Sequence, residues 1–187
     1  MLTTAFFTTV IICTIISDIL FPSLLAHGRK KEGISKNNFV FFYFYACLFF
    51  YYLTNKFSDY GVFVWRRFFE CIIFRYNKSK MSWLQFCYGF VYYHFVILAC
   101  YQYKPCKLFY FLNFIQFLAH FYIFKLSKFV KINFFIDFLL KCSHFFVEFL
   151  VYWLIYQSMK SKACLSILIY MALFVILSVK RKINEIN

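Results

Sequence analysis

The stretch ACLSILIYMALFVILSV, residues 163–179, contains no charged side chain and is followed at once by Lys180, Arg181 and Lys182. A helix rises about 1.5 Å per residue, so about 20 residues cross a hydrocarbon core about 30 Å thick. The stretch has roughly that length, and the cations after it are typical of a loop on the cytosolic side of a membrane. It therefore predicts a transmembrane helix that ends at a basic loop.

Six further apolar runs repeat this pattern towards the N-terminus. They occupy residues 2–25, 39–53, 58–74, 82–101, 108–124 and 134–157. The first run has no basic stretch before it and is too long for the core of a signal peptide, so we expect it to be a membrane helix. Because runs 39–53 and 58–74 are short, they can be tilted, lie in a thinned bilayer or form a re-entrant pair. The predicted fold class is all-α, a polytopic membrane helical bundle of about seven transmembrane helices in one domain, residues 1–187.

Composition excludes an ordinary soluble domain. Of the 187 residues, 64% are hydrophobic and 15% are charged, whereas soluble domains have about 45–50% apolar and about 25% charged residues. The net charge of +14 comes from short basic clusters between apolar runs, which indicates membrane loops and no nucleic acid partner. The eight cysteines have no metal-ligand or redox spacing, so we interpret them as small buried hydrophobes.

The loops between the runs differ in charge. Those on one side carry thirteen basic residues: Arg29, Lys30, Lys31, Lys36, Arg75, Lys78, Lys80, Lys125, Lys128, Lys131, Lys180, Arg181 and Lys182. Those on the other side carry five: Lys56, Lys104, Lys107, Lys160 and Lys162. The positive-inside rule then predicts a luminal N-terminus and a cytosolic C-terminus. The glycosylation sequon at Asn77 falls on the cytosolic side of this topology.

Polar side chains occur inside several apolar runs, where each charge costs about 2.5–3.5 kcal/mol near the bilayer centre. At helical spacing they form groups on single faces: Arg66, Arg67 and Glu70; Asn113, Gln116 and His120; and Asp137, Lys141, His144 and Glu148. Most belong to the cytosolic half of the predicted bundle, which indicates a polar cavity that opens to the cytosol. The structural alternative is that they snorkel to the interface or pair with one another, as Arg66 with Glu70 and Lys141 with Asp137 or His144. We interpret His94, among aromatic residues, as a core histidine.

Two motifs resemble a known family. Arg66-Arg67-Phe68-Phe69-Glu70-Cys71, followed by the segment QFCYGFVYY at residues 85–93, is similar to the middle of the polyprenol reductase branch of the steroid 5-alpha-reductase family. Members carry an R-R-x-x-E-C stretch and then a G-x-x-Y-Y segment at similar spacing.

Further pieces resemble the family in the same order along the chain. They are the basic turn at residues 25–30, the aromatic segment at residues 39–43, the Ala119-His120 pair, Asp137, and the segment CSHFFVE at residues 142–148. The last resembles the family's S-P-H-Y-L-x-E signature. Together the fragmentary matches span about residues 20–157.

The resemblance implies an endoplasmic reticulum enzyme that binds NADPH and reduces the alpha-unsaturated double bond of a polyprenol or polyprenal, a long-chain isoprenoid lipid. Its product would supply dolichol for protein N-glycosylation. It also implies catalytic roles for Glu70 and Arg67, which would order the cavity. The cofactor-binding residues it implies are His120, Lys125, Lys128, Asp137, His144 and Glu148.

The chain departs from the family pattern at several points. Phe41 replaces a histidine, Phe121 a glutamine and Ser143 a proline, and the family's cofactor-binding tail is not matched after the last apolar run. Two alternatives therefore stay open: a catalytically degenerate membrane scaffold, and an unrelated membrane-complex subunit or transporter. The substrate also stays open among polyprenol, polyprenal, a steroid enone and an enoyl thioester, as does the oligomeric state.

Overall fold

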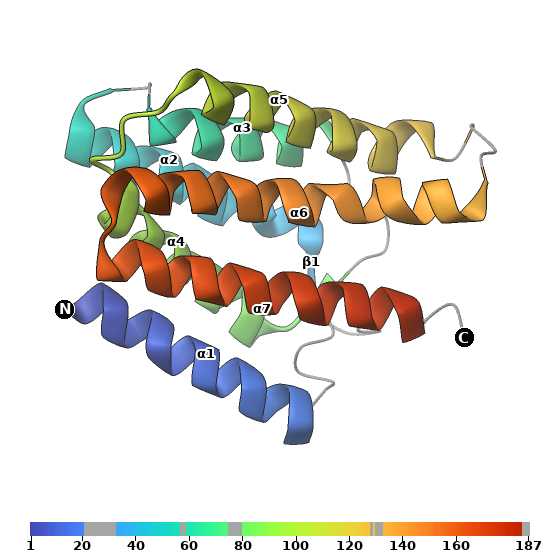
Figure 1. Cartoon of the computed structure of the whole chain (residues 1–187), viewed down its shortest axis with the longest axis horizontal. Helices are drawn as coiled ribbons and strands as arrows, with labels where there is room; N and C mark the ends of the chain where they lie inside the picture. Colours follow the sequence, from blue (N-terminus) through green and yellow to red (C-terminus); the bar gives the residue numbers. More distant parts are fainter. Residues whose placement is uncertain (21–32, 57–58, 75–79, 128, 130–132, 185–187) are drawn as a thin grey trace. The chain divides into compact units, whose positions relative to one another are not determined.

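The computed structural model describes residues 1–20, 33–56, 59–74, 80–127, 129 and 133–184. These residues form seven α-helices and two very short strands (Figure 1). The chain divides into two compact units, residues 1–102 (unit 1) and residues 103–187 (unit 2). The prediction of one domain stays a prediction, and the two units are described in turn.

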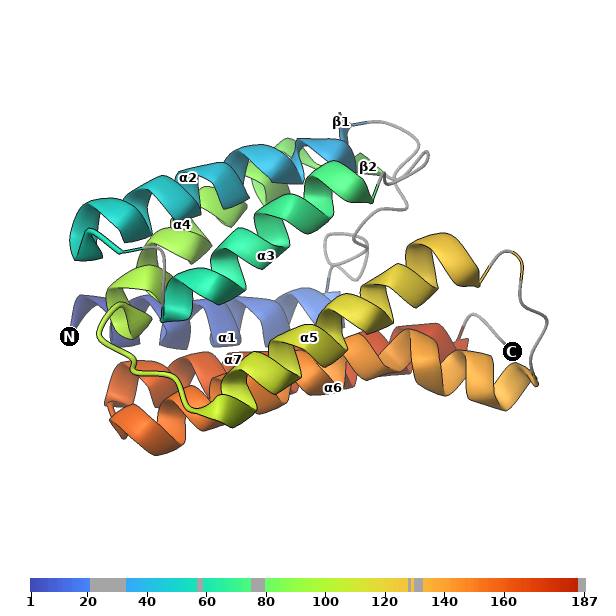
Figure 2. The same ribbon diagram turned by 90° about the horizontal axis from the view of Figure 1, so that it is seen from above.

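Unit 1 contains four α-helices. They are α1 (Leu2–Leu20), α2 (Phe39–Thr54), α3 (Tyr60–Ile73) and α4 (Trp83–Cys100). Helix α2 packs against both α3 and α4, while α1 packs along α4 (Figure 2). Phe42, Phe50, Tyr60 and Phe63 are buried between these helices, so the core of unit 1 is largely aromatic.

A short strand pair joins the segments that precede α2 and α4. Strand β1 (Ile34–Ser35), which leads into the turn η1 (Lys36–Asn38), pairs antiparallel with β2 (Lys80–Met81). Gly33 has a φ of 129°, and a Cβ there would lie 2.3 Å from the carbonyl oxygen of Met81, so this position requires glycine. The pairing brings Lys36 and Lys80 to the same end of unit 1, as the alternation of basic loops predicts.

Capping and close packing fix the start and the middle of α4. The Ser82 side chain accepts a hydrogen bond from the Gln85 N–H at 3.2 Å, and the Gln85 side chain accepts one from the Ser82 N–H at 3.0 Å, a capping box. One turn later, a Cβ at Gly89 would lie 2.7 Å from Cδ1 of Phe42. Gly89 therefore allows α2 and α4 to approach closely.

Unit 2 is a three-helix arrangement centred on α6. It contains α5 (Lys107–Phe121), which continues into the π-helical turn η2 (Tyr122–Leu126), then α6 (Phe134–Met159) and α7 (Lys162–Asn184). Helix α6 packs against both α5 and α7. Lys160 adopts the left-handed conformation that ends α6, and α6 and α7 then lie side by side in opposite directions (Figure 1).

The helical character predicted from the sequence is confirmed. A helix occupies each of the seven predicted runs, with ends that differ from the prediction by a few residues in the described parts of the chain. Among the residues that the structure describes, four helical segments are long and apolar enough to cross a membrane: Leu2–Leu20, Trp83–Cys100, Lys107–Leu126 and Lys162–Ile183. The protein thus has the helices of a membrane protein, whereas the number of seven spans stays a prediction. Helices α2 and α3, with 16 and 14 residues, are short for a crossing, as expected.

Candidate functional site

The last turns of α3 hold a buried ion network. Arg66 and Arg67 each pair with a different carboxylate oxygen of Glu70, and the distance from Arg67 Nη1 to Glu70 Oε2 is 2.7 Å. Only 2% of Glu70 is exposed. Spacings of three and four residues place these side chains on one face of a helix, so the expected pairing of Arg66 with Glu70 is formed.

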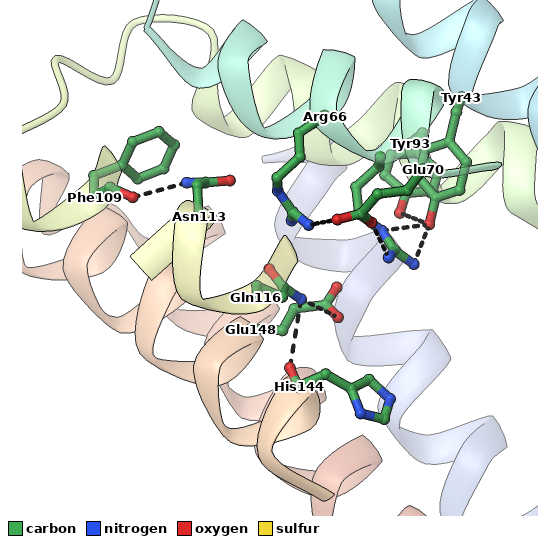
Figure 3. A network of polar contacts seen from close by, with 10 residues as sticks. Tyr43, Arg66, Glu70, Tyr93, Phe109, Asn113, Gln116, His144 and Glu148 are labelled. Atoms are coloured by element: carbon green, nitrogen blue, oxygen red, sulfur yellow. Dashed lines mark hydrogen bonds and ion pairs between the residues drawn. The ribbon is translucent and has the colours of Figure 1, made fainter. Parts of the chain in front are cut away.

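Two tyrosines from other helices complete this network (Figure 3). The Tyr43 hydroxyl, from α2, accepts hydrogen bonds from Arg67 Nε at 3.2 Å and Nη2 at 3.0 Å. The Tyr93 hydroxyl, from α4, lies 2.9 Å from the Tyr43 hydroxyl. We call Tyr43, Arg66, Arg67, Glu70 and Tyr93 the arginine network, and it ties α2, α3 and α4 together.

The arginine network combines an excess positive charge with phenol hydroxyls. Its two guanidinium groups and one carboxylate give a net charge of +1, and buried charges of this kind are costly unless they are paired and hydrogen-bonded. A fixed guanidinium beside hydroxyl groups can hold and polarise an oxygen of a bound molecule. The network therefore has the chemistry of a site that recognises a carbonyl or hydroxyl oxygen.

A second polar group lies between α5 and α6 in unit 2. The Gln116 side chain, fully buried, donates to Glu148 Oε2 at 3.2 Å and to the His144 carbonyl oxygen at 3.4 Å. The rings of His120 and His144 lie 5.1 Å apart. We call Gln116, His120, His144 and Glu148 the glutamine cluster; Figure 3 shows the Gln116 bonds. It brings together an amide, two imidazoles and a carboxylate.

Asn113 shares the buried face of α5 with Gln116 and His120, as the spacing predicts. Its side chain donates to the Phe109 carbonyl oxygen at 2.9 Å, within the same helix. A buried amide that bonds its own backbone is a structural solution to burial, so we leave Asn113 out of the glutamine cluster.

Asp137 in the first turn of α6 anchors a third polar group. Its Oδ1 accepts a hydrogen bond from the Tyr122 hydroxyl at 2.7 Å, and its Oδ2 lies 2.6 Å from Lys141 Nζ. Lys182 on α7 donates to the Lys141 carbonyl oxygen at 2.5 Å. Asp137 thus pairs with Lys141, one of the pairings that the sequence suggested.

The predicted site residues fall into these groups as follows. The expected catalytic residues, Arg67 and Glu70, contact each other in unit 1. Among the expected cofactor-binding residues of unit 2, His120, His144 and Glu148 belong to the glutamine cluster, Asp137 pairs with Lys141, and Lys125 is exposed on η2. Lys128 lies outside the described residues. Their roles, and the shared cavity, stay predictions.

The sequence alone did not single out Tyr43, Tyr122 or the partner of His94. The hydroxyl of Tyr45 lies 2.7 Å from Nδ1 of His94, so this histidine has a polar partner across α2 and α4. This pair joins residues 49 positions apart, while Tyr43 and Arg67 are 24 apart and Tyr122 and Asp137 are 15 apart. No spacing rule identifies such contacts in an aromatic-rich chain. In the described residues, all eight cysteines are free, and no three His, Cys, Asp or Glu side chains are grouped so that they could hold a metal ion.

No protein-family model, curated protein or solved structure matches this chain.

Proposed function

We propose that this protein is a membrane-embedded, NADPH-dependent reductase that saturates the alpha-unsaturated double bond of a polyprenol or polyprenal. It would act in the endoplasmic reticulum membrane, with its C-terminus in the cytosol, and supply dolichol for protein N-glycosylation. Helices able to cross a membrane suit a substrate that is itself a long lipid. The resemblance of residues 66–71 and 85–93 to polyprenol reductases supplies the reaction.

The observation that carries the proposal is the arginine network. Arg67 and Glu70 belong to the motif that resembles the family, and they are held on a rigid face of α3 with hydrogen bonds to Tyr43. Intramembrane charges are rare and mark functional sites by default. In this proposal the network fixes the oxygen end of the substrate and polarises it.

Saturating the double bond adds a hydride, which NADPH supplies when bound, and a proton, so that the lipid is reduced and the cofactor is oxidised. The residues of unit 2 have donor and acceptor groups that suit a dinucleotide. The glutamine cluster offers an amide, imidazoles and a carboxylate for the amide and hydroxyl groups of a cofactor, while Lys125 is an exposed cation that suits a phosphate. These side chains would bind and orient, and the aromatic side chains around them would exclude water.

A scaffold without catalytic activity is the second candidate, and one observation favours it. Both carboxylate oxygens of Glu70 are engaged by arginines of its own helix. A network that only ties α2, α3 and α4 together would have the same bonds. Enzyme and scaffold differ in turnover and in cofactor binding.

The test is turnover of polyprenal and polyprenol with NADPH by the purified full-length chain in detergent. We expect turnover by the native protein and a loss of at least about tenfold in Glu70→Gln and Glu148→Gln, because each change removes a carboxylate from a bonded cluster. Ser143→Ala is the matched control, since among the described residues the Ser143 hydroxyl bonds only the Leu140 carbonyl oxygen of its own helix. Equal turnover in all four proteins, or none in the native one, would refute the proposed site.

A further inference from the structure

Lys182, near the end of α7, is held against α6 by two neutral groups. Its Nζ donates to the Lys141 carbonyl oxygen at 2.5 Å and lies 5.0 Å from the centre of the Phe145 ring. The side chain is half-buried, so these contacts restrict it more than a lysine that is exposed on a helix end. The structure therefore fixes the position of one ammonium group beside α6.

The ammonium group of Lys182 has no carboxylate of its own in the described part of the chain. The carboxylate that acts on it electrostatically is that of Asp137, and both oxygens of Asp137 are engaged. One lies 2.6 Å from Lys141 Nζ, and the other accepts the hydrogen bond from the Tyr122 hydroxyl. Lys182 can therefore bind an anion without giving up an ion pair.

Phe145 connects Lys182 to the glutamine cluster within unit 2. The centre of its ring lies 3.8 Å from that of His144, and the His144 ring lies 5.1 Å from that of His120. Phe145 precedes Glu148 by three residues, so the two side chains share one side of α6. The ammonium group thus lies next to the glutamine cluster, with one aromatic ring between them.

We propose that Lys182 binds a phosphate group of the NADPH whose amide and hydroxyl groups the glutamine cluster holds, an inference that rests on the proposed function. Lysine binds phosphates as a compact point charge. A dinucleotide carries its phosphates away from its nicotinamide, so its site needs a cation beside the groups that hold the nicotinamide end. Lys182 has that place. Because its contacts position it before the ligand arrives, less side-chain entropy is lost on binding.

The test measures NADPH binding by the purified full-length chain in detergent, by thermal stabilisation and by the fluorescence of the dihydronicotinamide, with no lipid substrate present. Lys182→Met keeps a long apolar side chain beside Phe145 and removes the charge. The matched control, Lys162→Met, removes one exposed charge from the first residue of the same helix. NADH is the second probe, because it lacks only the 2′-phosphate of NADPH.

We expect Lys182→Met to bind NADPH at least about tenfold more weakly than the native chain, because it loses a charge-assisted hydrogen bond. Lys162→Met should match the native chain, and Lys182→Arg, which keeps the charge, should bind more tightly than Lys182→Met. Added salt should weaken binding to the native chain more than to Lys182→Met, since salt screens the pairing of ammonium and phosphate. A loss for NADPH alone assigns the 2′-phosphate to Lys182, and an equal loss for NADH assigns the pyrophosphate.

Equal NADPH affinity in the native chain and Lys182→Met, an equal loss in Lys162→Met, or the same salt dependence with and without the Lys182 charge would overturn the role of Lys182. The proposed function survives each of these outcomes, because the native chain binds NADPH in all of them. A native chain that does not bind NADPH refutes the proposed function and the role of Lys182 together. If Lys182→Met does not fold, Lys182→Gln replaces it, because its amide can still donate a hydrogen bond.

Discussion

Tyr43 on α2 and Arg67 on α3, 24 residues apart in the sequence, are joined by two hydrogen bonds, from Nε at 3.2 Å and from Nη2 at 3.0 Å. The guanidinium also lies 5.2 Å from the centre of the Tyr43 ring. One phenol thus satisfies two donors of a half-buried cation and ties the two helices together.

Tyr43→Phe should therefore destabilise unit 1 by about 1.5–3 kcal/mol, the range for hydrogen bonds to charged groups. The measurement is unfolding by titration with sodium dodecyl sulfate. Tyr52→Phe, also on α2 but 82% exposed, is the control and should change stability by less than about 0.5 kcal/mol. Similar losses in both variants would mean that the hydroxyl of Tyr43 contributes nothing specific.

Glu70 and Glu148 should differ sharply in their contribution to stability. Glu70→Gln removes the carboxylate that pairs with both Arg66 and Arg67 in a buried network. Removing one partner of a buried ion pair costs about 3–5 kcal/mol. Glu148 is half-buried, and a glutamine there keeps a carbonyl oxygen that can accept the 3.2 Å hydrogen bond from the Gln116 amide, so Glu148→Gln should cost less, about 1 kcal/mol. The same detergent titration compares them, and a larger cost for Glu148→Gln would contradict the arrangement of charges described for α3.

Gly89 should be intolerant of any side chain as long as Phe42 faces it. The Cβ of Gly89→Ala would lie 2.7 Å from Cδ1 of the Phe42 ring, and overpacking of this kind costs about 1–3 kcal/mol. Phe42→Leu removes the ring atoms that clash, so the double variant should lose less stability than the sum of the two single losses. Strict additivity in this double-mutant cycle would show that the two positions do not touch.

Much of the helical fold was predictable because the length of an apolar run, and the spacing of the polar residues within it, are local properties of the sequence. The i, i+4 pairs Arg66–Glu70 and Asp137–Lys141 follow from helix geometry once the helices are placed. The shared buried face of Asn113, Gln116 and His120 follows in the same way.

The tertiary contacts of the polar groups were not predictable. Nothing in the sequence selects Tyr43 from sixteen tyrosines as the partner of Arg67, or Tyr93 as the partner of Tyr43. Likewise, the Gln116–Glu148 bond depends on the rotation of α5 against α6, which apolar periodicity cannot fix when almost every face is apolar. The strand pair β1–β2 is two residues long on each side, too short to give a strand pattern.

Two buried amides on α5 allow a functional role of the glutamine cluster to be distinguished from a structural one. Gln116 and Asn113 are both buried amides on α5, but Gln116 bonds across to α6 whereas Asn113 bonds the Phe109 carbonyl oxygen of its own helix. Leucine at either position is an aliphatic side chain that can make no hydrogen bond. If the cluster orients the cofactor as proposed, Gln116→Leu should raise the KM for NADPH about tenfold with a smaller effect on kcat, because it alters binding and leaves the reacting atoms untouched. Asn113→Leu should leave both constants within about twofold of the native values. Steady-state kinetics at varied NADPH would check this, and equal changes in the two variants would assign the cluster to helix packing.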